Sequence, residues 1–196
     1  MSRTDARALL AAAAILLAGL AHAGSQQYEV LSASVRATLA KAVSDAAGND
    51  LYDMDSRVWV RAMTAKVQPK FADEEAARRF LAMVHYEALR AGLDPHLVIA
   101  VIDVESHFRR YAVSRSGARG LMQVMPFWVA QIGEPGQNLF HERTNLRYGC
   151  TILRHYLDRE NGNVVKALAR YNGSLGDAAY AQRVMKAWRE RWSLSL

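Results

Sequence analysis

The sequence predicts an all-α fold. Apolar residues recur three or four positions apart over most of the second half, and almost no stretch alternates apolar and polar residues with period two. Side chains that cap helices precede several of these apolar runs. Residues 114–124 lack this helical pattern and could form a small β-hairpin. The chain therefore reads as mainly helical.

The first clear helix is expected over residues 73–92. Asp73 is a good N-cap, and the two acids that follow it are favoured by the helix dipole. Apolar residues then recur on one face: Ala77, Leu81, Val84 and Ala88. Gly92 stands where such a helix would end.

The next helix is expected to be the central, buried one. Asp94 serves as its N-cap, and Pro95 occupies the first helical position, where a missing N–H costs nothing. Residues 97–102 are apolar almost all round, which is typical of a helix surrounded by other elements.

Four further helices are expected in the C-terminal part: 127–132, about 146–157, 164–171 and the segment after Asp177. Asn145 lies near the start of the second, and Asn163 would cap the third. The last has a packing stripe: Ala181, Val184, Trp188 and Trp192.

The part before residue 73 is less regular. Residues 35–47 and 58–67 are candidate helices, the first ended by a Gly-Asn-Asp break and the second by Pro69. We expect residues 24–72 to form a helical extension that packs on a main domain at 73–196, and the length suits one such domain.

Residues 1–23 have the layout of a secretory signal peptide. Arg3 and Arg7 precede an apolar run at 9–20, and small residues flank an expected cut after Ala23. A transmembrane anchor is the alternative, but the run is short for a bilayer. No Cys follows the cut, so we expect no lipid anchor, and no later stretch is apolar enough to span a membrane. The protein is expected to be exported to the periplasm.

The net charge of the chain limits the kinds of partner that it is expected to bind. The net charge is +6, which suits either nucleic acid or an anionic polymer outside the cytoplasm, and the export signal argues against nucleic acid. A solvated surface with a modest basic excess is the plain alternative.

Cys150 is expected to be a buried apolar residue. The six His show no metal-ligand spacing, and no phosphate loop occurs, so we expect no metal and no cofactor.

Three sequence blocks carry the strongest functional signal. Val-Glu-Ser-His-Phe spans 104–108, Gly-Leu-Met-Gln-Val-Met-Pro spans 120–126, and Ala-Leu-Ala-Arg-Tyr-Asn-Gly spans 167–173. In this order they resemble the catalytic domain of SLT-type lytic transglycosylases, over about residues 80–185. The chain departs from the family pattern at Arg170 and after Asn172, where Gly-Ser replaces Ala-Gly. It also lacks a Pro in the structural stretch 138–149.

The resemblance implies a lysozyme-like fold and a reaction on bacterial peptidoglycan. Members of this family cleave the β-1,4 bond between N-acetylmuramic acid and N-acetylglucosamine without water, leaving a 1,6-anhydromuramyl end. One acid protonates the leaving oxygen and then acts as a base toward the C6 hydroxyl. The resemblance assigns this role to Glu105. The expected partner is a peptidoglycan glycan strand, and the expected state is a monomer.

The residues around Glu105 independently suit an acid. Val98, Val101 and Ile102 share its helix face, and apolar surroundings raise the pKa of a carboxyl group. A raised pKa keeps the group protonated near neutral pH, as a general acid requires. From position alone, a solvated Glu at a frayed helix end near Arg109 is equally compatible.

No second carboxylate is evident in the sequence, although ordinary glycosidases use two. Asp103 would point to another side of the helix, and Glu134 and Glu142 lie in or near loops without a motif. A single acid fits the family, while an acid contributed by a loop stays open as an alternative.

Five more residues match family positions that support or bind the sugar: Ser114, Gln123, Met125, Tyr171 and Asn172. The resemblance implies that Ser114 bonds the catalytic carboxyl, and that the Tyr171 hydroxyl lies near Glu105 with its ring against sugar. Four of the five have a plainer alternative. Ser114 suits an ordinary turn, Met125 a core and Tyr171 a core with a satisfied hydroxyl. Asn172 with the following Gly suits a helix end.

Three other functions stay open at the level of sequence. A hydrolytic muramidase of goose-lysozyme type shares the fold and would leave a free reducing end. A catalytically idle module for wall binding or assembly is the second. The third is an enzyme that opens the wall for a secretion or conjugation machine.

Overall fold

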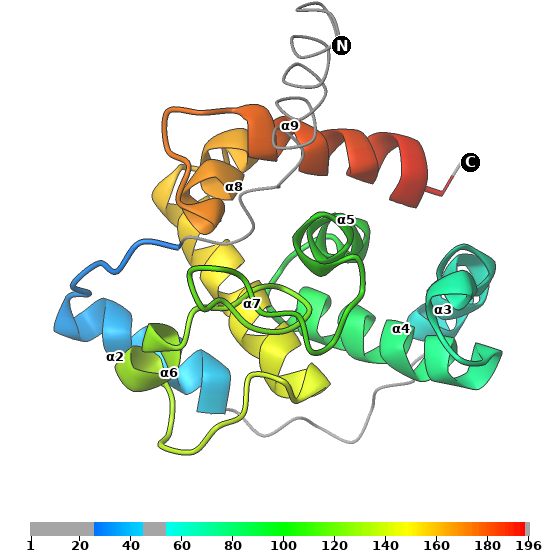
Figure 1. Ribbon diagram of the computed structural model, residues 1–196, viewed down its shortest axis with the longest axis horizontal. Helices are drawn as coiled ribbons and strands as arrows, with labels where there is room; N and C mark the ends of the chain where they lie inside the picture. The colour runs from blue at the N-terminus through cyan, green and yellow to red at the C-terminus, as the bar shows by residue number, and fades with distance from the viewer. Residues whose placement is uncertain (1–25, 45–53, 195–196) are drawn as a thin grey trace, which may run out of the picture.

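The structure, a computed structural model, describes residues 26–44 and 54–194. These residues form mostly helices (Figure 1): α2 (Ala33–Ser44), α3 (Met54–Val67), η1 (Gln68–Lys70), α4 (Glu74–Arg90), α5 (Pro95–Ser106), α6 (Phe127–Ile132), α7 (Glu142–Arg159), α8 (Val164–Asn172), α9 (Ala179–Lys186) and η2 (Ala187–Trp192). No strand occurs within the described ranges, so the all-α prediction is confirmed. The expected signal peptide lies outside them.

The predicted helix caps form as hydrogen bonds. Asp73 accepts from the Ala76 amide at 2.7 Å at the start of α4, and Asp94 accepts from the His96 amide at 2.7 Å at the start of α5. Asn163 accepts from the Lys166 amide at 3.0 Å and starts α8. These side chains satisfy amides that have no partner within their own helix, which fixes the helix starts.

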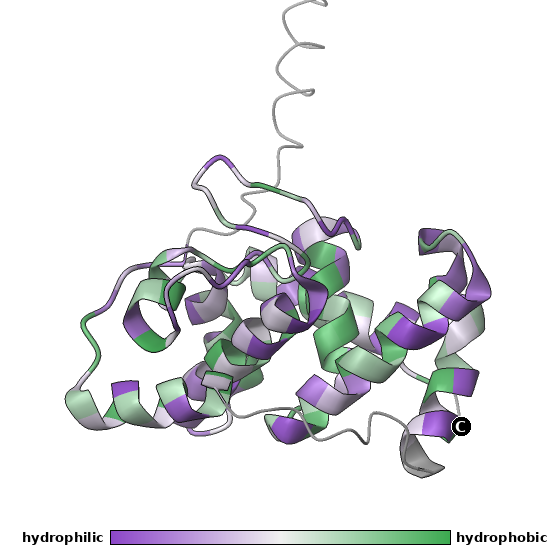
Figure 2. Ribbon diagram, turned by 90° about the horizontal axis from the view of Figure 1, so that it is seen from below, coloured by the Kyte–Doolittle hydropathy of each residue, from purple (hydrophilic) through white to green (hydrophobic). Residues whose placement is uncertain are grey.

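Helix α5 lies near the centre of the molecule, with α9 on one side and α4 on the other (Figure 1). Its residues 97–102 are all buried, as their apolar run predicts. The outer helices carry hydrophobic and hydrophilic residues interspersed along their length (Figure 2), as helices with one buried face do. No helix in the described part of the chain is long and apolar enough to cross a membrane.

The N-terminal part packs against the rest of the protein. The Trp59 indole donates to His96 at 3.0 Å, which ties α3 to the start of α5. Arg90 of α4 donates to the Ala42 carbonyl at the end of α2 at 2.6 Å. Leu39 and Val43 of α2 belong to the same hydrophobic core as α4 and α5. Both N-terminal helices start earlier than their sequence patterns suggested.

Residues 107–126 fold into tight turns. Only two isolated bridges form there, Val113 with Arg119 and Arg119 with Val124. The backbone has positive φ at Gly120 (76°) and at Gln123 (49°), which bends the chain before a second rung can form. A Cβ at position 120 would lie 2.4 Å from the Asn145 side chain, so this turn requires glycine. The expected hairpin is thus reduced to isolated bridges.

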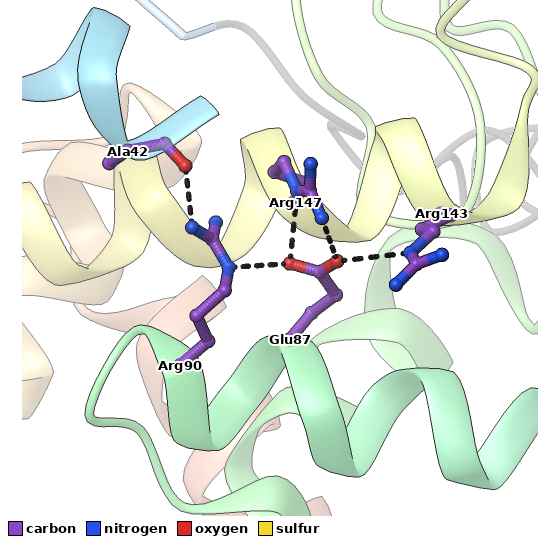
Figure 3. Close-up of polar contacts among 5 residues, drawn as sticks. All are labelled: Ala42, Glu87, Arg90, Arg143 and Arg147. Carbon is purple, nitrogen blue, oxygen red and sulfur yellow. Dashed lines mark hydrogen bonds and ion pairs between the residues drawn. The ribbon is translucent and has the colours of Figure 1, made fainter. Parts of the chain in front are cut away.

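A fully buried carboxylate joins α4 to α7 (Figure 3). Glu87 is 0% exposed and lies 3.0 Å from Arg90, 2.9 Å from Arg147 and 3.6 Å from Arg143. Since Arg90 also donates to the end of α2, one carboxylate organises three guanidinium groups between three helices. We call these four residues the Glu87 cluster.

Candidate active site

Glu105 lies in the last turn of the central helix. It is 5% exposed, and α5 ends one residue later. His107 follows in the left-handed conformation with φ of 50°, and its amide donates to the Asp103 carbonyl at 3.1 Å. This cap stops the helix and turns the chain away. Glu105 is therefore held on a rigid, buried helix instead of a frayed end.

The polar surroundings of the Glu105 carboxyl come mainly from α9. The Tyr180 hydroxyl donates to Oε1 at 2.7 Å. The other oxygen, Oε2, is buried and has no hydrogen-bond partner of ordinary geometry among the described residues. Arg109 makes a different contact, donating to the Ser106 carbonyl at 3.0 Å. The solvated alternative near Arg109 therefore does not describe the structure.

Burial has the largest effect on the pKa of Glu105. Loss of water raises its pKa from 4.5 to about 8, although the Tyr180 hydroxyl, the Arg183 charge and the Asn172 amide act in the opposite direction. No other carboxylate is among the groups that shift this pKa. The group is thus mainly protonated at neutral pH, and it can donate a proton.

Tyr171 and Asn172 close the end of α8 beside this acid. The Tyr171 side chain is fully buried, and its hydroxyl donates to the Met122 carbonyl at 2.7 Å. Burial raises the pKa of this phenol, and the Glu105 charge adds to the effect, so the two groups are near each other. The hydroxyl bonded to Glu105 nevertheless belongs to Tyr180. The Tyr171 hydroxyl is turned toward the 120–126 turn, and the contact of its ring with sugar stays a prediction.

Gln123 and Met125 hold this turn in place. Gln123 is 1% exposed and donates from Nε2 to the Gly120 carbonyl at 2.8 Å and to the Ala112 carbonyl at 3.2 Å. Met125 is half-buried against the core, and its amide donates to the Gln26 side chain at 3.1 Å. Their contact with sugar stays a prediction.

Ser114 lies in the turns that follow α5. Its Oγ accepts from the Ala118 amide at 3.0 Å and lies 3.1 Å from the Ser116 hydroxyl. These contacts order the turn. The bond from Ser114 to Glu105 that the family resemblance implies stays a prediction.

Asp103 faces away from the partners of Glu105. Its Oδ2 accepts from the Trp192 indole at 3.0 Å and lies 3.1 Å from Arg191, so it fastens η2 to α5. Glu142 lies 3.8 Å from Arg110. The structure thus gives each of these carboxylates a structural partner. In the described ranges, no group of three His, Cys, Asp or Glu side chains is placed to hold a metal ion.

Tyr180 is the site residue that sequence reasoning missed. It lies directly before the apolar stripe predicted for the last helix, and it is 3% exposed. Its partner Glu105 is 75 residues away in the chain, and no motif marks the pair. Contact between α5 and α9 places the two side chains together.

The fold and site define a helical domain with one buried, protonated carboxylic acid next to a tyrosine hydroxyl. A family model described as "Transglycosylase SLT domain" matches residues 82–191, more than half of the chain. The chain belongs to this family, as its three sequence blocks indicated.

The relatives that the chain matches are also named as transglycosylases. The chain is 28% identical over 135 residues to "Membrane-bound lytic murein transglycosylase C" of Photorhabdus laumondii, covering 61% of this chain and 37% of the relative. It is 31% identical over 130 residues to the protein of the same name from Yersinia pestis, covering 58% and 36%. The chain thus spans little more than a third of these relatives. The solved structure of an inactive mutant of lytic transglycosylase Slt from Pseudomonas aeruginosa is 30% identical, covers 63% of this chain and 22% of its own, and has a TM-score of 0.46.

Proposed function

We propose that the protein is a peptidoglycan lytic transglycosylase with Glu105 as its single catalytic acid. The substrate is the β-1,4 bond between N-acetylmuramic acid and N-acetylglucosamine, and the product end is a 1,6-anhydromuramyl group. The observation that carries the proposal is the burial of Glu105, whose pKa of about 8 keeps it protonated at neutral pH. Family membership supports the reaction class.

The proposed reaction needs only one side chain to move protons. Protonated Glu105 gives its proton to the glycosidic oxygen as the bond to C1 of the muramic acid breaks. The resulting carboxylate then takes the proton of the C6 hydroxyl on the same sugar, and O6 bonds to C1. Glu105 ends protonated again, and no water is consumed. The absence of another carboxylate among the groups that shift the pKa of Glu105 supports this one-acid scheme.

The remaining roles are assigned around this acid. Tyr180 holds the Glu105 carboxyl by its hydrogen bond, and Asn172 lies close enough to stabilise its charged form. Ser114, Gln123, Met125 and Tyr171 would line or shape the sugar site through the turns that they order. The substrate lies outside the cytoplasm, so the protein acts after export to the periplasm, as a monomer without a cofactor.

The product chemistry tests the proposal. Purified protein is incubated with isolated sacculi, and the released muropeptides are identified by mass spectrometry, with Glu105→Gln in parallel. We expect anhydromuramyl products, lighter by one water than reducing-end products, from the unmodified protein only. Reducing-end products would make it a muramidase and overturn the transglycosylase assignment. Retention on sacculi without any release would favour an idle wall-binding module.

Replacement of Tyr180 by Phe is expected to shift the alkaline limb of the pH profile upward. The Tyr180 hydroxyl stabilises the charged form of Glu105, so its loss raises the pKa of Glu105 further. Activity that requires the protonated acid then persists to higher pH, while kcat falls about tenfold because the carboxyl loses its anchor. The measurement is kcat/KM for muropeptide release from pH 5 to 10.

Tyr171→Phe is the matched control, since its hydroxyl is bonded to the Met122 carbonyl. We expect its alkaline limb to coincide with that of the unmodified protein, whatever happens to its rate. Alkaline limbs at the same pH in the unmodified protein and in both variants would contradict the proposal that Tyr180 lowers the pKa of Glu105.

A further inference from the structure

Residues 26–31 form an extended segment that runs ahead of α2, outside the residues matched by the family model (Figure 1). We call it the N-terminal strap. Gln26 is 4% exposed, and its Oε1 accepts from the Met125 amide at 3.1 Å. The Glu29 carbonyl accepts from the Gln131 side chain at 3.0 Å, and the Glu29 carboxylate pairs with Arg159. The strap is thus fastened to the turn before α6, to α6 itself and to α7.

The strap and α6 enclose a cavity of about 200 Å³. Its wall includes two aromatic rings, Tyr28 and Phe127, whose centroids lie 5.5 Å apart at 80°. Tyr28 is 63% exposed, although it packs against Phe127. The side chains of Arg36 and Gln131 complete the polar part of the wall. The cavity wall therefore combines two aromatic rings and two hydrogen-bonding side chains with the aliphatic residues Val30, Leu31 and Ala130.

This mixture of groups suits a sugar. An aromatic ring packs against the C–H face of a pyranose, while amide and guanidinium groups bond hydroxyl, acetamido and carboxylate oxygens. Arg36 is exposed and has no ion pair among the described residues, so its charge is available to a carboxylate.

The strap that lines the cavity also contacts the turn beside the proposed catalytic site. Phe127 is two residues beyond Met125, and Gln26 of the strap holds the Met125 amide. The same turn accepts the Tyr171 hydroxyl at the Met122 carbonyl, and Tyr171 is near Glu105. The strap is therefore linked to the surroundings of Glu105 through packed side chains.

We propose that the N-terminal strap and α6 form a distal glycan subsite, in which Tyr28 and Phe127 pack against an N-acetylated sugar and Arg36 pairs with its pendant carboxylate. The proposal rests on the proposed function in taking a peptidoglycan strand as the ligand. It makes the strap part of the substrate groove, although the strap lies outside the family match. The affinity of the protein for a glycan strand should therefore increase once the strand is long enough to reach this subsite.

The test compares Tyr28→Ala with Tyr111→Ala on glycan strands of increasing length prepared from sacculi. Tyr111 is 69% exposed and does not line the cavity, so it is a matched control. We expect Tyr28→Ala to raise the apparent KM about tenfold on long strands, with kcat unchanged and with no effect on strands too short to reach the cavity. Tyr28→Phe keeps the ring and should restore the KM.

A binding measurement separates this proposal from the catalytic one. Glu105→Gln and Glu105→Gln/Tyr28→Ala are sedimented with purified sacculi, and the bound fractions are compared, with thermal unfolding checked for both. Weaker retention of the double variant at equal stability supports the subsite even if no anhydro product is ever found. Equal retention, or an equal loss from Tyr111→Ala, overturns the subsite and leaves the proposed reaction untouched.

Discussion

Replacing Glu105 with Gln is expected to lower the rate of muropeptide release about a thousandfold. Gln keeps the size of the side chain, and its amide oxygen can still accept the Tyr180 hydrogen bond. Its amide has no acidic proton to transfer to the glycosidic oxygen. The rate is measured on purified sacculi at neutral pH for both proteins. Circular dichroism serves as the control for folding. A variant with a tenth or more of the original rate would place the acid elsewhere.

The same substitution is expected to stabilise the fold at alkaline pH. Burial raises the pKa of Glu105 from 4.5 to about 8, so the folded protein keeps a proton that the unfolded chain releases between these two values. The free energy of unfolding contributed by this group is therefore fully present below about pH 4.5 and is lost as pH rises toward 8. Gln does not titrate, and its advantage should grow by about 1.4 kcal/mol per pH unit across this window.

Urea unfolding at several pH values measures this difference. We expect nearly equal stabilities at pH 4 and a more stable Glu105→Gln variant at pH 8. A difference that does not change with pH would mean that the carboxyl is not buried in solution. This result would remove the physical basis for its role as an acid.

Replacing Glu87 with Ala is expected to lower the free energy of unfolding by about 3–5 kcal/mol. Glu87 is fully buried and is the carboxylate on which Arg90, Arg143 and Arg147 converge. Without it, positive charges remain close together in the interior with no anion between them. The measurement is urea unfolding at neutral pH.

Glu74→Ala is the matched control on the same helix. Glu74 pairs with Arg78 at 2.6 Å, but its side chain is 60% exposed, and an exposed pair contributes less than about 1 kcal/mol. Similar losses from both substitutions would contradict the special role of the buried cluster. Retained stability in Glu87→Ala would do the same.

The helices could be predicted because their signals are local. Asp73, Asp94 and Asn163 stand directly before their helices and cap amides two or three residues away. The apolar run before Glu105 is likewise compatible with a buried carboxyl, because neighbours on one helix face share their surroundings, but position alone fitted a solvated Glu equally well. In these cases the sequence within a few residues contains the physical cause.

The rest of the candidate site depends on contacts between distant segments. Tyr180 meets Glu105 only because α9 packs on α5, and Gln26 meets Met125 across 99 residues. The direction of the Tyr171 hydroxyl follows from the shape of the 120–126 turn, where Gln123 adopts positive φ. No periodicity within one segment specifies such contacts, so the sequence did not reveal that Tyr180 donates to Glu105.

The docking of η2 on α5 has a consequence for the order in which activity arises. Trp192 and Arg191 hold Asp103 of α5, and Tyr180 covers the neighbouring acid. A nascent chain synthesised only as far as Gly173 contains every residue of the three family blocks but lacks this cover. Its Glu105 would be hydrated and ionised at neutral pH, as an ordinary glutamate is. The proton on which the proposed chemistry depends is therefore acquired late in biosynthesis, after the sequence motifs themselves are complete.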